Sequence, residues 1–326
     1  MVSRELVEVP SGAPLVPLSP EARRYIHAAR SPRTLALYVR CWSMFLDWLD
    51  ATGRPSSFPA SFPVSARTLV EYLTARADAG LKVATIELDL AAITDAHKTA
   101  GFPSPRDLPL VRETWRGIRR TLSIRQRQVD PLLADDLVKI CRVLPETLTG
   151  LRDRALLTIG FTCALRRSEI SALDIEDVFV SETRRTLRVT VRRSKTDQAG
   201  EGAVVTALAA QRHPEACPVA AFEAWVEAMP NAAGPLFRGI RGTRIRERLH
   251  PQMVAHIVKD AVTRAGLDPS DFSGHSLRRG FATSAAIAGR PDRLIQWHGR
   301  WERAEMVDRY VGDVYSERES ALKDVI

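Results

Sequence analysis

A long hydrophobic run is missing from this sequence. The longest nearly apolar stretch, Ala155 to Leu165, is far shorter than the roughly 20 residues that cross a bilayer. The first residues combine Glu5 and Glu8 with several prolines and lack the basic patch and apolar block of a signal peptide. We therefore expect neither membrane insertion nor export.

Cysteine is scarce, with four residues in a chain of 326. Cys41, Cys141, Cys163 and Cys217 lie 100, 22 and 54 positions apart, a spacing that fits neither a zinc site nor a small disulfide scaffold. This pattern suits a reducing compartment, so we expect a cytoplasmic protein.

Lysine is also rare, because only six of the 47 basic residues are lysines and the other 41 are arginines. Codon usage in a GC-rich genome explains much of such a bias, but arginine forks also bind phosphate in a bidentate manner. With 39 acidic residues, the net charge is +8. The arginines cluster in segments 112–127 and 238–248, which are either solvated faces or surfaces for nucleic acid.

The length of the chain indicates two domains, and its composition is that of a globular protein. Residues 1–19 are predicted to be a flexible arm. Residues 20–122 are predicted to form a compact domain of four amphipathic helices, because apolar residues recur at helical spacing after the cap residues Ser31 and Ser65. The polar stretch 123–131 is predicted to be the linker.

Residues 132–326 are predicted to form a mostly helical α+β domain. Helices are expected at 134–143, 152–173, 218–228, 251–265, 276–288 and 291–297, followed by short helical pieces. Two alternating segments, 187–191 and 203–207, predict strands of one small antiparallel sheet. A polar turn that contains Lys195 joins them.

Two motifs in this second domain combine arginine with other chemically active groups. Arg166 and Glu169 are three residues apart at the end of an apolar segment. An ordinary ion pair on a helix surface would explain this spacing. His275 and Arg278 are three apart at the start of a predicted helix, after Ser273-Gly274. A helix start with these two side chains is a ready anion site, although a capping histidine and a surface arginine would show the same pattern.

A third motif lies near the carboxyl end. Trp297-His-Gly-Arg-Trp301 is followed by Tyr310, nine residues beyond Trp301. Tyr310 is one of only five tyrosines, and Tyr315 is its one competitor as a nucleophile. His298 is an alternative to Trp301 as an aromatic donor, but Trp301 has the glycine two residues before it.

Taken in order, these residues resemble the tyrosine recombinase (phage integrase) family. That family has an arginine followed by glutamate, a lysine in a β-hairpin, His-x-x-Arg, a histidine or tryptophan after glycine, and a tyrosine nine residues on. The matching positions here are Arg166, Glu169, Lys195, His275, Arg278, Trp301 and Tyr310. Tryptophan at 301, the Ser-Gly-His-Ser opening and the four-helix first domain are most similar to the Cre-type subgroup.

The matched set suits phosphoryl transfer without metal, ATP or another cofactor. Arg166 and Arg278 would neutralise the charge that develops on the phosphate oxygens. Tyr310 would attack the phosphate to give a 3′-phosphotyrosyl bond, with His275 as the base that removes its proton.

The remaining matched residues complete the expected machinery. Lys195 would protonate the departing 5′ oxygen, and Trp301 would offer its indole N–H to a phosphate oxygen. Glu169 is expected to orient its neighbours, because a free carboxylate beside a phosphate would repel it.

The resemblance also implies the partners. They are a double-stranded DNA site with inverted repeats and three further copies of the chain, with strand exchange through a Holliday junction. In the tail 316–326, apolar residues share one helical face, which would dock on the next protomer or pack on its own domain.

DNA contacts are expected from both domains, with residues 20–122 as a core-binding, SAM-like domain. Base recognition is expected around 82–99 and 238–259. The arginines expected to contact DNA are Arg112, Arg116, Arg119, Arg120, Arg125, Arg127, Arg241, Arg244 and Arg246.

Two other functions fit the same residues. A type IB topoisomerase-like enzyme would share the phosphotyrosyl chemistry but relax supercoils as a monomer. A non-catalytic DNA-binding relative would keep the fold alone. The helical first domain and the tail favour the recombinase over the first, and the complete catalytic set favours it over the second.

Overall fold

The computed structural model divides the chain into two compact units, residues 1–126 and 127–326. It describes residues 19, 24–25, 30–56, 62–122, 129–181, 183, 185–192, 202–230 and 233–318. Beyond residue 312, only the backbone is described. Most of the predicted arm 1–19 and linker 123–131, together with Arg125, Arg127 and Lys195, lie outside these residues. The last residues of the tail, 319–326, do so as well.

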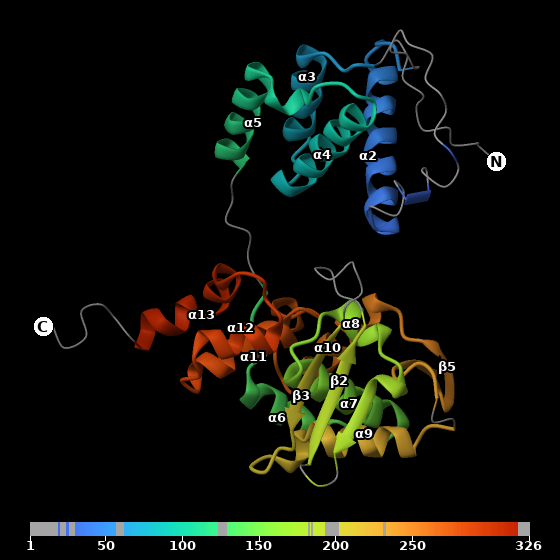
Figure 1. Ribbon diagram of the computed structural model, residues 1–326, viewed down its shortest axis with the longest axis vertical. Helices are drawn as coiled ribbons and strands as arrows, with labels where there is room; N and C mark the ends of the chain where they lie inside the picture. Colours follow the sequence, from blue (N-terminus) through green and yellow to red (C-terminus); the bar gives the residue numbers. More distant parts are fainter. Residues whose placement is uncertain are drawn as a thin grey trace, which may run out of the picture. The chain divides into compact units, whose positions relative to one another are not determined.

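The first unit contains the four helices that the sequence predicts (Figure 1). They are α2 (Pro32–Ala51), α3 (Ala66–Asp78), α4 (Val83–Thr99) and α5 (Pro109–Leu122), with a 3₁₀ turn η1 (Pro105–Asp107) before α5. Ser31 and Ser65 cap α2 and α3, since each side chain accepts a hydrogen bond from the backbone N–H three residues on. Helix α2 packs on α4, and α3 packs on α5.

The second unit is mostly helical, as predicted. Its helices are α6 (Ala134–Val143), α7 (Leu148–Thr162), α8 (Arg167–Ala172), α9 (Pro218–Glu227), α10 (Pro251–Arg264), α11 (Ser276–Ile287), α12 (Asp292–Gly299) and α13 (Ala304–Arg318). The short pieces expected after residue 297 are in fact the single 15-residue helix α13. None of the described helices is long and apolar enough to cross a membrane.

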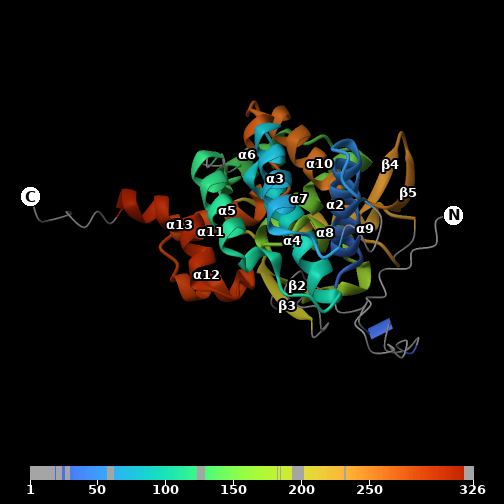
Figure 2. The same ribbon diagram turned by 90° about the horizontal axis from the view of Figure 1, so that it is seen from above.

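The predicted small antiparallel sheet is present in the second unit, and the described residues also form a second sheet that the sequence did not predict. Strands β1 (Val178–Ser181), β2 (Thr186–Val191) and β3 (Ala203–Leu208) form an antiparallel sheet in that order. Strands β4 (Arg238–Arg241) and β5 (Arg244–Arg248) form a separate hairpin. It lies at the edge of the unit in both views (Figures 1 and 2). Its arginines obscure the apolar alternation that identifies a half-buried strand.

The predicted helix 152–173 is also wrong, because the chain breaks it after Thr162. Ala164 adopts a left-handed conformation (φ 48°). The N–H of Leu165 then bonds to the Gly160 carbonyl and that of Ala164 to the Phe161 carbonyl, which ends α7. Arg166 therefore becomes the N-cap of a new helix, α8, instead of a residue within a long one.

Helices α11, α12 and α13 gather on one side of the second unit, away from the sheet (Figure 1). Their buried core is small and separate from the main one, and it is formed by Ala282, Ala286, Ile295, Trp301, Val307 and Val311. This three-helix cluster fixes the position of α13 against α11 and thereby brings Tyr310 to the motif at 275–278.

The segment 129–134, which leads into α6, is tied to α11 and the turn before it. The N–H groups of Asp130 and Leu132 donate to the carbonyls of Asp271 and Ser276 at 2.6 and 3.0 Å, and that of Ala134 donates to Ser284 Oγ at 2.9 Å. The approach is close at Gly280, where a Cβ atom would lie 1.7 Å from the Leu132 carbonyl oxygen.

Replacing Gly280 by alanine should therefore destabilise the protein. We expect Gly280→Ala to lower the free energy of unfolding by about 2–3 kcal/mol, because backbone must move to admit the methyl group. Urea denaturation of the full chain measures this loss. The matched control is Gly117→Ala in α5, where the new methyl group meets no atom within 4 Å. It should be neutral or stabilising by up to about 1 kcal/mol. Equal stability of Gly280→Ala and wild type would contradict the close approach.

Candidate active site

His275 and Tyr310 meet where α11 begins against α13. Nε2 of His275 lies 3.1 Å from the hydroxyl oxygen of Tyr310. The Ser273 hydroxyl accepts a hydrogen bond from the His275 N–H, and Ser276 Oγ accepts one from the Ser273 N–H, which shapes the turn. Thr283 on α11 donates to the Tyr310 carbonyl at 3.0 Å and holds the backbone of α13 in place. In the tautomer protonated at Nδ1, the histidine can accept the phenolic proton.

His275 is neutral at pH 7 in this environment. Its side chain lies at the exposed mouth of the site, but partial desolvation by the surrounding protein lowers its pKa from 6.5 to about 4. The positive charges of Arg278, Arg279, Arg166 and Arg167 also lower this pKa, in that order. A neutral imidazole beside a phenol is the protonation state that a general base requires.

Arg278 is almost fully buried, with 1% of its surface exposed. Its Nη1 donates to the Ala164 carbonyl at 2.5 Å, whereas Nη2 is buried without a hydrogen-bond partner among the described residues. Burial, followed by the charge of Arg166, lowers its pKa to about 9, so it remains a cation at pH 7. Its guanidinium carbon lies 4.3 Å from the centre of the Trp301 ring.

Arg166 and Glu169 are joined twice at the start of α8. The Glu169 carboxylate accepts a hydrogen bond from the Arg166 backbone N–H at 2.9 Å and another from Nη1 of the same residue at 2.6 Å. The Glu169 side chain is only 1% exposed, so this carboxylate is inside the protein and fixes the direction of the arginine. The ion pair that the spacing allows is thus present.

Arg300 joins the same group, although the sequence analysis did not select it. Its Nη2 donates to Glu169 Oε2 at 3.0 Å and to the Ala164 carbonyl at 3.3 Å. It ends α12 in a left-handed conformation (φ 57°, ψ 47°), which turns the chain back toward Trp301. The one sequence signal was its place between Gly299 and Trp301 within the third motif.

Trp301 and His298 have different surroundings. The Trp301 ring lies 5.7 Å from that of Tyr310 and is buried beside Arg278. His298 instead stacks on Phe281 at 4.6 Å, and its Nε2 lies 2.7 Å from the Thr162 carbonyl oxygen. Gly299 is needed here because a Cβ atom would be 1.8 Å from the Trp301 ring. The geometry thus favours Trp301 over His298 as the aromatic group of the site.

Lys195 lies outside the described residues, but β2, the strand that precedes it in the chain, is anchored. Arg192 follows β2 and pairs with Asp177 at 2.6 Å and with Asp174 at 2.9 Å. Arg248 at the end of β5 pairs with the other oxygen of Asp174 at 2.5 Å. Tyr315 belongs to α13, and its side chain is likewise outside the described set.

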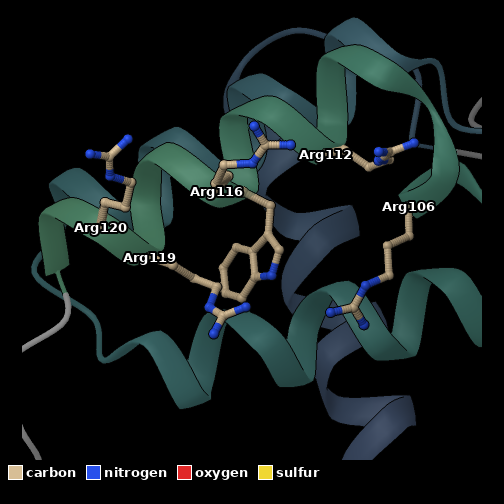
Figure 3. Close-up of a pocket in the computed structure, with 6 residues that line it drawn as sticks. Arg106, Arg112, Arg116, Arg119 and Arg120 are labelled. Atoms are coloured by element: carbon tan, nitrogen blue, oxygen red, sulfur yellow. The ribbon is translucent and has the colours of Figure 1, made fainter.

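The arginines of α5 line an open pocket of about 570 Å³ in the first unit (Figure 3). Arg112, Arg116, Arg119 and Arg120 are exposed and have no ion-pair partner among the described residues. They surround the buried Trp115, and Arg106 from η1 completes the lining. Arg106 differs from the four because it pairs with Glu87 at 2.5 Å.

The arginines of the β4–β5 hairpin fall into two groups. Arg241, Arg244 and Arg246 are exposed. Arg238 and Arg248 instead donate to backbone carbonyls and therefore stabilise the fold. No group of three or more His, Cys, Asp or Glu residues within the described ranges could hold a metal ion.

A family model covers the stretch of chain that contains these residues. The model described as "Phage integrase family" matches residues 130–317, which is more than half of the chain. The chain belongs to the phage integrase family of tyrosine recombinases. It is therefore a site-specific recombinase, as the sequence predicts.

Curated relatives of this recombinase cover most of its length. The "Integrase/recombinase xerD homolog" of Selenomonas ruminantium is 35% identical over 310 residues, 92% of this chain and 88% of that protein. The "Recombinase cre" of Escherichia phage P1 is 25% identical over 304 residues, 85% and 84% of the two chains. Proteins named XerC and XerD also match this chain, so the matches do not single out the Cre-type subgroup, which remains a prediction.

Solved structures share the fold of the recombinase. The Tn1549 transposon integrase in complex with a circular intermediate DNA aligns with a TM-score of 0.60 at 16% identity, over 91% of this chain and 97% of that one. The XerH site-specific recombinase in a post-cleavage complex aligns with a TM-score of 0.57 at 18% identity, over 82% and 74%.

Removing a neighbouring positive charge should raise the pKa of His275. We expect Arg279→Gln to raise it by about half a unit, because protonation of the ring then meets less repulsion. Proton NMR of the imidazole against pH, assigned with His275→Gln, measures the change. Arg293→Gln, an exposed arginine of α12 that is absent from the charges acting on His275, serves as control. An unchanged or lower pKa of His275 in Arg279→Gln would show that the charge of Arg279 does not influence protonation of the imidazole.

Proposed function

We propose that this recombinase cuts and rejoins DNA through a 3′-phosphotyrosyl intermediate formed on Tyr310. The observation that carries the proposal is the 3.1 Å approach of His275 Nε2 to the Tyr310 hydroxyl, beside the buried guanidinium of Arg278, whose Nη2 has no partner in the described part of the chain. A phenol is almost fully protonated at pH 7, so attack on phosphorus requires a base at this position.

The proposed step is an in-line displacement at phosphorus. The Tyr310 oxygen forms a bond to the scissile phosphorus as its proton passes to His275, and the bond to the 5′ oxygen breaks. Lys195 supplies the proton that converts this leaving oxygen to a 5′-hydroxyl. Since the ester with tyrosine conserves the energy of the broken bond, attack by a 5′-hydroxyl of another strand rejoins the DNA without ATP.

Positive charge held in place before the reaction stabilises the transition state. Arg278 cannot move freely, because the Ala164 carbonyl and the Trp301 ring fix it, and Arg166 is fixed by Glu169. Donors that need no reorganisation are worth about 3–4 kcal/mol each in barrier height. The Trp301 ring packs beside that of Tyr310 and restricts the position of the phenol.

The exposed arginines provide a surface for the DNA backbone. Four guanidiniums on α5 and three on the β4–β5 hairpin have no ion-pair partner among the described residues, so each can contact phosphate without first breaking such a pair. The substrate is a duplex site with inverted repeats. Four copies of the chain assemble on two such sites, exchange strands through a Holliday junction, and contact one another through the tail 316–326.

The decisive experiment traps the covalent intermediate. Full-length Tyr310→Phe protein first selects a bound duplex from a random-sequence library. Wild-type, Tyr310→Phe and Tyr315→Phe proteins then react with that duplex nicked at successive positions, so that the short 5′-hydroxyl fragment leaves and traps the adduct. We expect a denaturant-resistant protein–DNA band with wild type and Tyr315→Phe, and none with Tyr310→Phe.

The other outcomes separate the competing functions. If wild type forms no adduct on a duplex that it binds, the chain is a DNA-binding protein and the proposal fails. If only Tyr315→Phe abolishes the adduct, the nucleophile is misassigned. Plasmids carrying two selected sites then distinguish exchange of flanking DNA, which we expect, from relaxation without exchange, which would identify a topoisomerase-like enzyme.

Arginines of α5 should contribute to the salt dependence of DNA binding. We expect Arg116→Gln and Arg119→Gln each to reduce the slope of log K against log salt by about 0.9, because each lost phosphate contact releases one counterion fewer. Fluorescence anisotropy on the selected duplex at several KCl concentrations measures the slope. Arg67→Gln is the control, since Arg67 is exposed but already pairs with Glu71. Unchanged slopes in both α5 variants would place the DNA on another face.

A further inference from the structure

Arg300 lies between the two guanidiniums that the proposed chemistry uses. It shares the Glu169 carboxylate with Arg166, and it shares the Ala164 carbonyl with Arg278. Its side chain is 15% exposed, comparable to that of Arg166 at 16%. One carboxylate and one carbonyl thus hold three like charges together inside the protein.

The hydrogen bonds of Arg300 are incomplete. Its Nε and Nη1 are buried and have no hydrogen-bond partner among the described residues, as is also true of Arg278 Nη2. Unpaired buried donors on a charged group are costly in free energy. Arg300 and Arg278 carry these open donors while sharing the Ala164 carbonyl, so the group they form with Glu169 holds positive charge that its own acceptors only partly offset.

The charge of this hydrogen-bonded group depends on Arg300. Glu169 cancels one positive charge, so Arg166 and Arg278 alone would leave a net charge of +1. A phosphodiester carries one negative charge, and its oxygens gain a second as the nucleophile attacks. The third guanidinium restores a net charge of +2, which matches the transition state.

We propose that Arg300 is a charge-compensating positioning residue of the active site, which offsets the buried Glu169 carboxylate and keeps the group at +2. Its positive charge attracts the scissile phosphate. Its hydrogen bonds to Glu169 and to the Ala164 carbonyl keep the groups around Arg166 and Arg278 in position. This inference rests on the phosphotyrosyl chemistry proposed above. Neither Arg166 nor Arg278 can replace it, because each is already required to balance one of the two negative charges.

The test compares the same variants on two DNA substrates. One is the selected duplex in its nicked, trapping form. The other is the same duplex with a methylphosphonate at the scissile position, where a methyl group replaces one charged oxygen. The enzymes are wild type, Arg300→Gln, Arg300→Lys and the control Arg303→Gln, which removes an exposed arginine three residues further along. The readouts are the single-turnover rate of adduct formation and the melting temperature.

We expect Arg300→Gln to form the adduct about 10- to 100-fold more slowly than wild type on phosphate DNA. On methylphosphonate DNA, this deficit should shrink to about threefold or less, because the transition state then carries one negative charge fewer. Arg300→Lys keeps the charge and should react at least about five times faster than Arg300→Gln. Arg303→Gln should match wild type on both substrates.

Several results would overturn the inference. A rate of Arg300→Gln equal to that of wild type would show that its charge is not needed. An equal deficit on both substrates, with a lowered melting temperature, would show a purely structural role. If Arg300→Lys formed the adduct as slowly as Arg300→Gln, the reaction would require the planar set of guanidinium donors and not the positive charge. These results presuppose an active wild type, whereas an inactive wild type would instead remove the proposed function.

Discussion

Guanidiniums repel one another, and the site depends on the single carbonyl that holds two of them together. The left-handed turn at Ala164 ends α7 and begins α8, and its carbonyl accepts hydrogen bonds from Arg278 and Arg300. A continuous helix would have used that oxygen for its own backbone bonding. The break in the helix is thus what makes an acceptor available among three cations, and it also frees the start of α8 to direct Arg166.

The sequence predicted most helices of both units and the pairing of His275 with Tyr310, for different reasons. Amphipathic spacing and serine caps are local signals, and they identified α2 to α5 directly. The site residues came from a family pattern, because no local signal relates residues 35 positions apart. Their meeting depends on α13 packing against α11, which only the folded chain shows.

The errors have physical causes as well. An alanine in a left-handed conformation is uncommon, so nothing at Ala164 predicted the break that glycine would have indicated. The β4–β5 hairpin was hidden by its arginines, of which Arg238 and Arg248 turn out to stabilise the fold. Arg300 was overlooked because its importance comes from two acceptors more than 130 positions away.

The bonds between segment 129–134 and α11 have a practical meaning for anyone who divides this protein into fragments. Helix α6 begins at Ala134, and a fragment started there would seem complete by its secondary structure. It would nevertheless lose the backbone donors of Asp130 and Leu132 and the carbonyl of Val129, which accepts a hydrogen bond from Arg279. The start of α11 beside His275 would thus lose its hydrogen bonds on one side. A fragment of the second unit that folds by itself must therefore begin several residues before α6.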